Sequence, residues 1–213
     1  SGGDSRGVRQ DFAYDVFGNT TQVIDYGVVE AGGDETFSLT SFAPNTRDYL
    51  VSCPVQELRY QGSSQAGALL SGSTFSYDGA SAGQAPARCE KTQQDDWLTG
   101  SSWITTKQWS YDASGNRVSE ADGVGNTTAT VYDGSYNLFP VETRFPKYAS
   151  DQRFRTRTEW NFACGQPSSQ TDMNGQVTTI GYDALCREND RRLPSGYQER
   201  RGYANYGNPS AQY

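Results

Sequence analysis

The sequence predicts an all-β fold in which β-hairpins stack into one long, curved or spiralling antiparallel sheet. Three observations lead to this prediction: a five-residue motif that recurs along the chain, aromatic or β-branched residues at alternating positions beside it, and a composition with 23 glycines but one methionine. Such a balance favours tight turns and thin sheets. No stretch shows sustained helical periodicity with capping residues, so we expect no helix.

The motif is an aromatic residue, then Asp or Asn, two variable residues and Gly. Copies that keep the aromatic and the Gly begin at Tyr14, Tyr111 and Tyr203, the last with Ala204 in place of Asp or Asn. Altered copies begin at Tyr77, Tyr132, Trp160 and Tyr182. From Tyr111 onward the copies are 21, 28, 22 and 21 residues apart. A period of this length is typical of proteins in which each repeat is one supersecondary unit stacked on its neighbours. The repeat-motif residues are Tyr14, Asp15, Gly18, Tyr77, Asp78, Tyr111, Asp112, Gly115, Tyr132, Asp133, Trp160, Asn161, Tyr182, Asp183, Tyr203 and Gly207.

Each repeat is predicted to contain two strands and two turns. The residue two positions before the motif aromatic is itself often apolar, as in Phe12 and Tyr14 or Phe75 and Tyr77, and residues two apart share one face of a strand. The motif is predicted to be a turn, because Asp or Asn bonds nearby backbone N–H groups and Gly supplies a positive φ. A second turn, such as 122–126 or 172–175, lies midway, and the β-branched segments 127–131 and 177–180 follow.

The predicted domain organisation is a single β-domain over residues 8–213. Residues 1–7 are interpreted as a cloning scar or a disordered start. Regular repeats occupy 103–213, with an insertion at 144–152, whereas 27–102 holds elaborated hairpins with expected strands at 37–42 and 49–60.

The four cysteines are Cys53, Cys89, Cys164 and Cys186. Cys164 and Cys186 both fall on the Gly position of consecutive repeats, so stacking should bring them to the distance that a disulfide spans. Cys53 and Cys89 then pair by elimination. The alternative is four free thiols; a zinc site is disfavoured because the chain has no histidine and no CxxC spacing. Two disulfides indicate an extracellular or cell-surface protein.

The composition excludes several classes of function. Without histidine, Ser-His-Asp and Cys-His catalysis are absent. A net charge of −7 disfavours nucleic acid as a partner, and the basic clusters 153–157, 191–192 and 200–201 are predicted to be a solvated face. No apolar run is long enough to span a membrane. We expect no catalytic, cofactor-binding or metal-binding residues: the acidic candidates (Asp95 with Asp96, Asp183 with Glu188, and the calcium-like segment 122–126) are interpreted as structural.

The pattern Tyr-Asp-x-x-Gly-Asn at about 21-residue spacing resembles the YD repeat of the Rhs family. Residues 14–27, 41–51 and 132–141 are similar in particular to the YD-repeat region of insecticidal toxin-complex B components, and the resemblance covers nearly all of residues 8–213. The departures are the two cysteines at Gly positions and the weakened copies at Tyr132 and Tyr203. No autoprotease segment or toxin domain is visible.

The resemblance implies an arc of an Rhs-type shell: a non-catalytic structural segment of a secreted bacterial protein that encloses a toxin polypeptide. Its partners would be other parts of the same larger polypeptide or a shell partner subunit. The alternative is an extracellular adhesin or a self-assembling surface or filament subunit, built from the same repeats and associating through open sheet edges. A glycosidase or protease with paired carboxylates is the third, least favoured reading.

Overall fold

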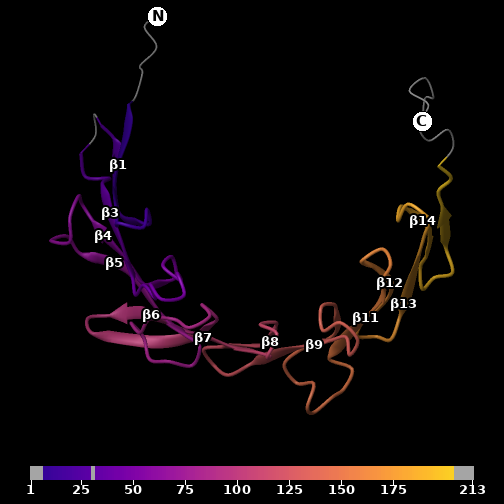
Figure 1. Ribbon diagram of the computed structural model, residues 1–213. Helices are drawn as coiled ribbons and strands as arrows, with labels where there is room; N and C mark the ends of the chain where they lie inside the picture. Colours follow the sequence, from indigo (N-terminus) through magenta and orange to yellow (C-terminus); the bar gives the residue numbers. More distant parts are fainter. Residues whose placement is uncertain (1–6, 30–31, 204–213) are drawn as a thin grey trace, which may run out of the picture. The chain divides into compact units, whose positions relative to one another are not determined.

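The computed structural model describes residues 7–29 and 32–203, and this part of the chain consists of strands and turns with no helix (Figure 1). Fifteen strands form one sheet in which the strand order is the order in the sequence, from β1 to β15. The predicted all-β fold of stacked antiparallel hairpins is therefore confirmed. Residues 1–6 and Gly207, the last residue of the final motif copy, lie outside the described residues.

The bounds of the strands follow the predicted rhythm of two strands for each repeat. They are β1 (Val8–Tyr14), β2 (Thr20–Val28), β3 (Thr36–Phe42), β4 (Pro54–Gln61), β5 (Leu69–Tyr77), β6 (Lys91–Thr99), β7 (Ser102–Tyr111), β8 (Arg117–Asp122), β9 (Thr127–Tyr132), β10 (Pro140–Arg144), β11 (Arg155–Asn161), β12 (Gln166–Thr171), β13 (Val177–Tyr182), β14 (Glu188–Arg192) and β15 (Gln198–Arg200).

The chain divides into two compact units. Unit 1 comprises Ser1–Tyr111 and Glu120–Asn126, and unit 2 comprises Asp112–Ser119 and Thr127–Tyr213. Within unit 1, antiparallel pairing runs without interruption from β1 to β7. Within unit 2, it runs from β9 to β15. The single domain over 8–213 stays a prediction.

A β-bulge recurs where a strand reaches its motif aromatic. The register shifts between Ala13 and Tyr14 and between Ser76 and Tyr77 in unit 1, and between Gly181 and Tyr182 in unit 2. A bulge places two residues of one strand opposite one of its partner, which bends the strand and increases its twist. The aromatic side chain is therefore re-aimed, and strict alternation does not describe its position.

The strand expected at 49–60 begins later, at Pro54. Residues 43–53 instead form a loop that Asn45 and Leu50 close by two backbone hydrogen bonds of 3.0 and 2.9 Å. Tyr49 has a φ of 56°, which is incompatible with an extended strand. The apolar run 49–51 suggested a strand, but this closed turn determines the conformation.

Few apolar side chains of the described residues are fully buried, as expected for thin sheets. A core cluster lies in unit 1, where Val55, Phe75 and Tyr77 pack with Cys53 and Cys89. In unit 2, Ile180 is 9% exposed. With so small a core, the hydrogen bonds between hairpins become important for stability.

Candidate functional site

The motif turns share one hydrogen-bond pattern. In the first copy, Asp15 Oδ1 accepts the backbone N–H groups of Phe17 and Asn19, both at 2.9 Å, while Gly18 takes a φ of 87°. Asp112 binds Ser114 and Asn116 in the same way at 2.8 and 3.0 Å. The Asp carboxylate thus satisfies backbone donors that a tight turn would otherwise leave unpaired.

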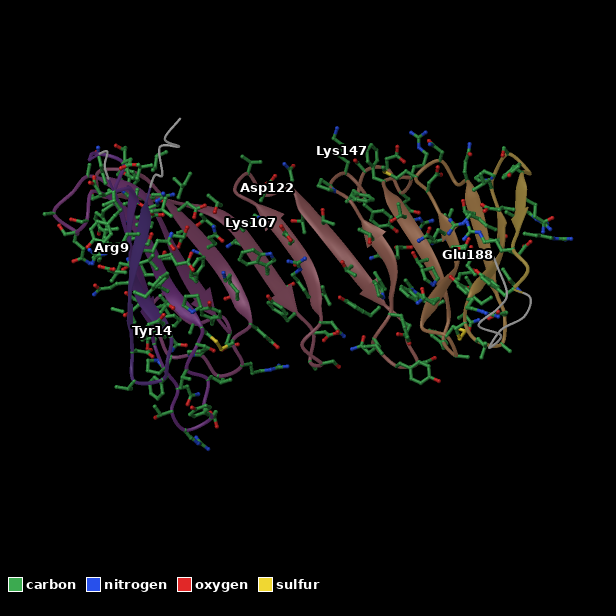
Figure 2. The ribbon with its side chains drawn as sticks, turned by 90° about the horizontal axis from the view of Figure 1, so that it is seen from above. Arg9, Tyr14, Lys107, Asp122, Lys147 and Glu188 are labelled. Atoms are coloured by element: carbon green, nitrogen blue, oxygen red, sulfur yellow. A yellow bond between two sulfur atoms is a disulfide. The ribbon has the colours of Figure 1, made fainter. Side chains whose placement is uncertain are left out.

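The same pattern occurs at the turns midway through the repeats. Asp122 accepts the N–H groups of Val124 and Asn126 at 3.0 and 2.9 Å. Figure 2 shows Tyr14 and Asp122 near opposite ends of the strands in unit 1. In the segment 122–126, which resembles a calcium loop, the carboxylate of Asp122 therefore accepts hydrogen bonds from its own turn. No group of three or more side chains that could ligate a metal occurs among the described residues.

Asparagine at the end of the motif connects one hairpin to the next. Asn19 Nδ2 donates to Asp15 Oδ2 at 2.8 Å and to the carbonyl oxygen of Val51 at 2.7 Å. In unit 2, Asn116 Nδ2 reaches Asp112 Oδ2 at 3.1 Å and the carbonyl oxygen of Asn137 at 2.7 Å. Each asparagine therefore links its own turn to the corresponding loop of the following repeat.

The motif aromatics make the reverse connection, to the preceding repeat. Tyr77, Tyr182 and Tyr203 donate through their hydroxyls to the carbonyl oxygens of Pro54, Pro167 and Glu188 at 2.8, 2.7 and 2.9 Å. Trp160 donates through Nε1 to the carbonyl oxygen of Pro140 at 2.9 Å. Tyr132 donates through its hydroxyl to the carbonyl oxygen of Arg117 at 3.4 Å.

These acceptors have a common place in the fold. Pro54, Pro140, Pro167 and Glu188 are the residues opposite the preceding aromatics Phe42, Tyr132, Trp160 and Tyr182 across the bulge. The result is a ladder of hydrogen bonds from aromatic to backbone. Sequence reasoning placed these aromatics but missed their hydrogen-bond partners, because the partners are backbone atoms.

Two motif aspartates are strongly stabilised as carboxylates. Partial burial favours the protonated form of Asp112, but hydrogen bonds from Asn137 and Asn116 outweigh it and lower its pKa to about 2. Asp133 is only 6% exposed, and despite its desolvation four backbone N–H groups, those of residues 135, 136, 138 and 139, hold its pKa well below the usual value. Both side chains are thus permanent acceptors at neutral pH.

The remaining motif residues also hold turns. Asp78, with a φ of 56°, accepts the N–H groups of Ala87, Arg88 and Glu90. Asn161 Oδ1 accepts the N–H of Cys164 at 3.2 Å. Tyr111 ends β7, and Gly115 adopts a φ of 85°.

The structure contains disulfides between Cys53 and Cys89, with Cα atoms 6.2 Å apart, and between Cys164 and Cys186, at 5.3 Å. The pair Cys164–Cys186 is the one that the repeat register predicts, and Cys53–Cys89 is the pair expected by elimination. The two turns of the second pair differ locally: Cys186 has a φ of 59°, whereas in the other turn Gly165, one residue after Cys164, takes the positive φ of 63°.

The candidate acidic pairs are engaged in structural contacts. Asp95 accepts the hydroxyl of Thr105, and Asp96 accepts those of Ser73 and Thr106, all at 2.6 to 2.7 Å. Hydrogen bonds from arginines at 187 and 191 lower the pKa values of Asp183 and Glu188, respectively. These lowered pKa values keep Asp183 and Glu188 ionised, whereas the general acid of a glycoside hydrolase needs a raised pKa.

The basic cluster 153–157 is ion-paired. Glu142, only 8% exposed, accepts Arg144 Nε at 2.6 Å and Arg157 Nε at 2.7 Å, with Arg155 Nη1 at 3.5 Å. Arg153 pairs with Asp151 at 2.7 Å. The prediction of a solvated face did not include Glu142, which lies directly opposite Arg157 across β10 and β11.

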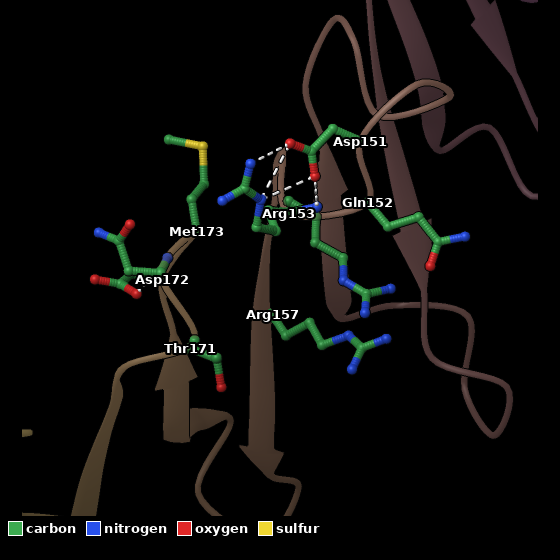
Figure 3. A pocket seen from close by; sticks show the side chains of 10 residues that line it. Asp151, Gln152, Arg153, Arg157, Thr171, Asp172 and Met173 are labelled. Carbon is green, nitrogen blue, oxygen red and sulfur yellow. Dashed lines mark hydrogen bonds and ion pairs between the residues drawn. The ribbon is translucent and has the colours of Figure 1, made fainter.

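Beside this cluster lies a pocket of about 430 Å³ (Figure 3). One wall is Arg155, Arg157 and the segment 151–153, and the other is the turn from Thr171 to Gly175.

No helix in the described residues is long and apolar enough to cross a membrane.

In comparisons by sequence, no protein-family model and no curated protein matched the chain. Solved structures did match. The crystal structure of TcdB2-TccC3-Cdc42 has a TM-score of 0.61 at 13% identity, over 84% of this chain and 13% of that chain. That of TcdB2-TccC3 has a TM-score of 0.60 at 13% identity, with the same coverage.

The crystal structure of TcdB2-TccC3 without its hypervariable C-terminal region matches with a TM-score of 0.51 at 14% identity, over 92% of this chain and 11% of that chain. The chain therefore spans only about an eighth of the length of these proteins. At such identity the likeness concerns the fold. The fifteen-stranded sheet of hairpins is similar in fold to TcdB2-TccC3 toxin-complex structures, which agrees with the resemblance of its motif to the YD repeat.

Proposed function

We propose that this chain is a non-catalytic structural segment of a YD-repeat shell that encloses a toxin polypeptide. The observation that carries the proposal is that strand order equals sequence order throughout the sheet, with side-chain hydrogen bonds from repeat to repeat. Such a sheet extends by adding hairpins, so many repeats can build one continuous wall. The likeness to toxin-complex components supports the same reading.

The proposed partners are other parts of the same larger polypeptide or a shell partner subunit. The two disulfides favour an extracellular setting, because such bonds persist in oxidising compartments. The proposed absence of catalysis is supported by the hydrogen bonds that engage the candidate carboxyls, which lower the pKa values of Asp96, Asp183 and Glu188.

Electron microscopy and protease protection of the native polypeptide, purified from the cells that make it, test the proposal. We expect a hollow particle whose wall contains these strands, together with a second segment that resists protease until the wall is opened with denaturant. A solid particle, or equal proteolysis of all segments before and after opening, would contradict enclosure.

A second candidate is a self-assembling surface or filament subunit, which β1 favours. Among the residues that the structure describes, this outer strand pairs only with β2, and Val8 and Phe12 are 79% and 51% exposed. Unpaired strand edges are templates for pairing with another chain. Filaments or ordered oligomers in the same micrographs would support this candidate over the shell.

A further inference from the structure

The insertion that lengthens one repeat carries positive charge in an acidic protein. Residues 142–157 contain five basic side chains and two acidic ones, whereas the whole chain has a net charge of −7. Lys147, in this insertion, lies at one edge of unit 2 in Figure 2. A local excess of this sign attracts anions and repels cations.

The arginines of this cluster outnumber their carboxylate partner. Arg144, Arg155 and Arg157 all share Glu142, and Arg144 and Arg157 contact it through Nε. A guanidinium carries five N–H donors, so the recorded contacts of Arg157 leave the donors of its outer fork for a further acceptor. Its side chain is 53% exposed.

Arg157 faces two adjoining pockets. It lines the pocket of about 430 Å³ with Arg153 and Arg155. It also lines a second pocket of about 580 Å³, whose walls combine the apolar residues Val131, Trp160 and Phe162 with the charged residues Arg144, Glu142 and Glu159. Phe162 is 44% exposed and contacts Tyr136 edge-on, with ring centroids 5.3 Å apart. An anion site therefore lies beside an apolar and aromatic surface.

The walls favour a carboxylate over a phosphate. Asp151 and Asp172 line the first pocket with the three arginines, so the excess positive charge is small and suits a monoanion. Figure 3 shows Arg153 held by Asp151, with the Arg157 side chain separate from that pair. The planar guanidinium of arginine matches the geometry of a carboxylate. Met173 offers an apolar contact to a polypeptide, and Gln152 and Asn174 offer hydrogen bonds to its backbone.

We propose that this pair of pockets, which we call the Arg157 site, binds an extended polypeptide segment in which an acidic residue stands next to an apolar one. The carboxylate binds Arg157 and Arg155, and the apolar side chain packs on Trp160 and Phe162. Arginine and large aromatics commonly dominate peptide-binding energies. Binding at this site does not depend on the proposed shell.

The test is fluorescence anisotropy with the 213-residue chain and a labelled decapeptide of alternating Glu and Leu. The control peptide has Gln in place of Glu. We expect the acidic peptide to bind about tenfold tighter or better, since hydrogen bonds to charged groups are worth this much, and to weaken as salt is added. Equal binding of the two peptides would overturn the proposal.

Two variants that are expected to change the peptide affinity in opposite directions separate an effect on binding from an effect on folding. Arg157→Gln should lower the affinity about tenfold, whereas Asp151→Asn, which removes a competing carboxylate from the wall, should raise it. Arg192→Gln, an exposed arginine of β14 outside both pockets, is the matched control and should change nothing.

Circular dichroism verifies that each variant is folded. If Arg157→Gln and Arg192→Gln behave alike, or if Asp151→Asn weakens binding, the assignment is wrong. Displacement of the peptide by inorganic phosphate or a single-stranded oligonucleotide at similar concentrations would overturn the choice of a carboxylate.

Discussion

Aspartate in the motif acts as an acceptor within its turn. Asp15, Asp112 and Asp183 each gather two backbone N–H groups through Oδ1, the second from the residue four positions later. The following position of positive φ is served by Gly18 and Gly115, and by a disulfide-bonded cysteine at 186. Cysteine tolerates this conformation less well than glycine, so the covalent bond holds a turn that glycine adopts by itself.

Asp112→Asn tests the acceptor role through pH. The folded pKa of about 2 lies below the ordinary 3.8, so the carboxylate stabilises the fold above about pH 4 and this contribution is lost as pH falls towards 2. We expect the variant to be less stable than the wild type at pH 7. Urea unfolding at pH 7, 4 and 2.5 should show the difference shrinking; a pH-independent difference would contradict the role.

At the scale of the elements, hairpins are joined by polar contacts as well as by the ladder of the sheet. Asparagine reaches forward to the next repeat and the motif aromatic reaches back to the previous one. A thin sheet buries few apolar residues, so these contacts supply order that a larger core would provide elsewhere. These contacts thereby fix the register between hairpins at the ends of the strands that carry the motif turns.

Asn19→Ala and Asn126→Ala form a matched pair that isolates the forward contact. Both asparagines bond the aspartate of their own turn at 2.8 Å, but only Asn19 also reaches a neighbouring hairpin, at Val51. We expect Asn19→Ala to cost about 1 kcal/mol more free energy of unfolding than Asn126→Ala, the usual net worth of one hydrogen bond. Equal losses in urea titrations would show that the contact to Val51 contributes nothing.

The disulfide of unit 2 clamps two neighbouring hairpins. Replacing Cys164 and Cys186 together by Ala removes the constraint on a loop with a sequence separation of 22. We expect the free energy of unfolding to fall by about 3 kcal/mol, because the unfolded chain gains conformational entropy. Trp160 is the tryptophan of unit 2, so its fluorescence in a background without the three tryptophans of unit 1 reports the unfolding of this unit. Reduction of the wild type with dithiothreitol breaks the same bond and should reproduce the loss. Unchanged stability in the double variant would refute the clamp.

On the scale of the whole molecule, the order of the strands in the described residues leaves β1 and β15 as outer strands. An outer strand with apolar side chains offers both backbone hydrogen bonds and buried area to another strand. Phe12 and Tyr14 on β1 are 51% and 60% exposed. The purified chain is therefore expected to associate through β1 as its concentration rises.

Phe12→Lys should suppress this association, because a charge on an outer strand opposes pairing with another edge. Sedimentation velocity over a range of concentrations measures the effect. Val16→Lys is the control: Val16 is 93% exposed but lies in the turn after β1, so its replacement should leave association unchanged. Equal association of all three proteins would exclude β1 as the contact.

Local chemistry made much of this fold predictable. Asp, Asn and Gly at fixed offsets specify turns through contacts within five residues, and β-branched segments between them specify strands. The repeat period then places Cys164 beside Cys186, because equivalent positions of consecutive hairpins are neighbours. The strands at β3, β9 and β13 agree with those expected from the sequence.

Only the tertiary structure decided the rest. The carbonyls that receive the motif aromatics, and the contacts of buried Glu142 with Arg155 and Arg157, join residues distant in sequence. The loop that delays β4 to Pro54 is closed locally by Asn45 and Leu50, but it also receives the distant Asn19 at Val51. Bulges shift the register by one residue and re-aim side chains, so alternation along the sequence cannot place them. By itself the sequence determined the hairpins and their order, because turns and period are local; the contacts that lock one hairpin to the next depend on backbone atoms, which carry no residue-specific signal.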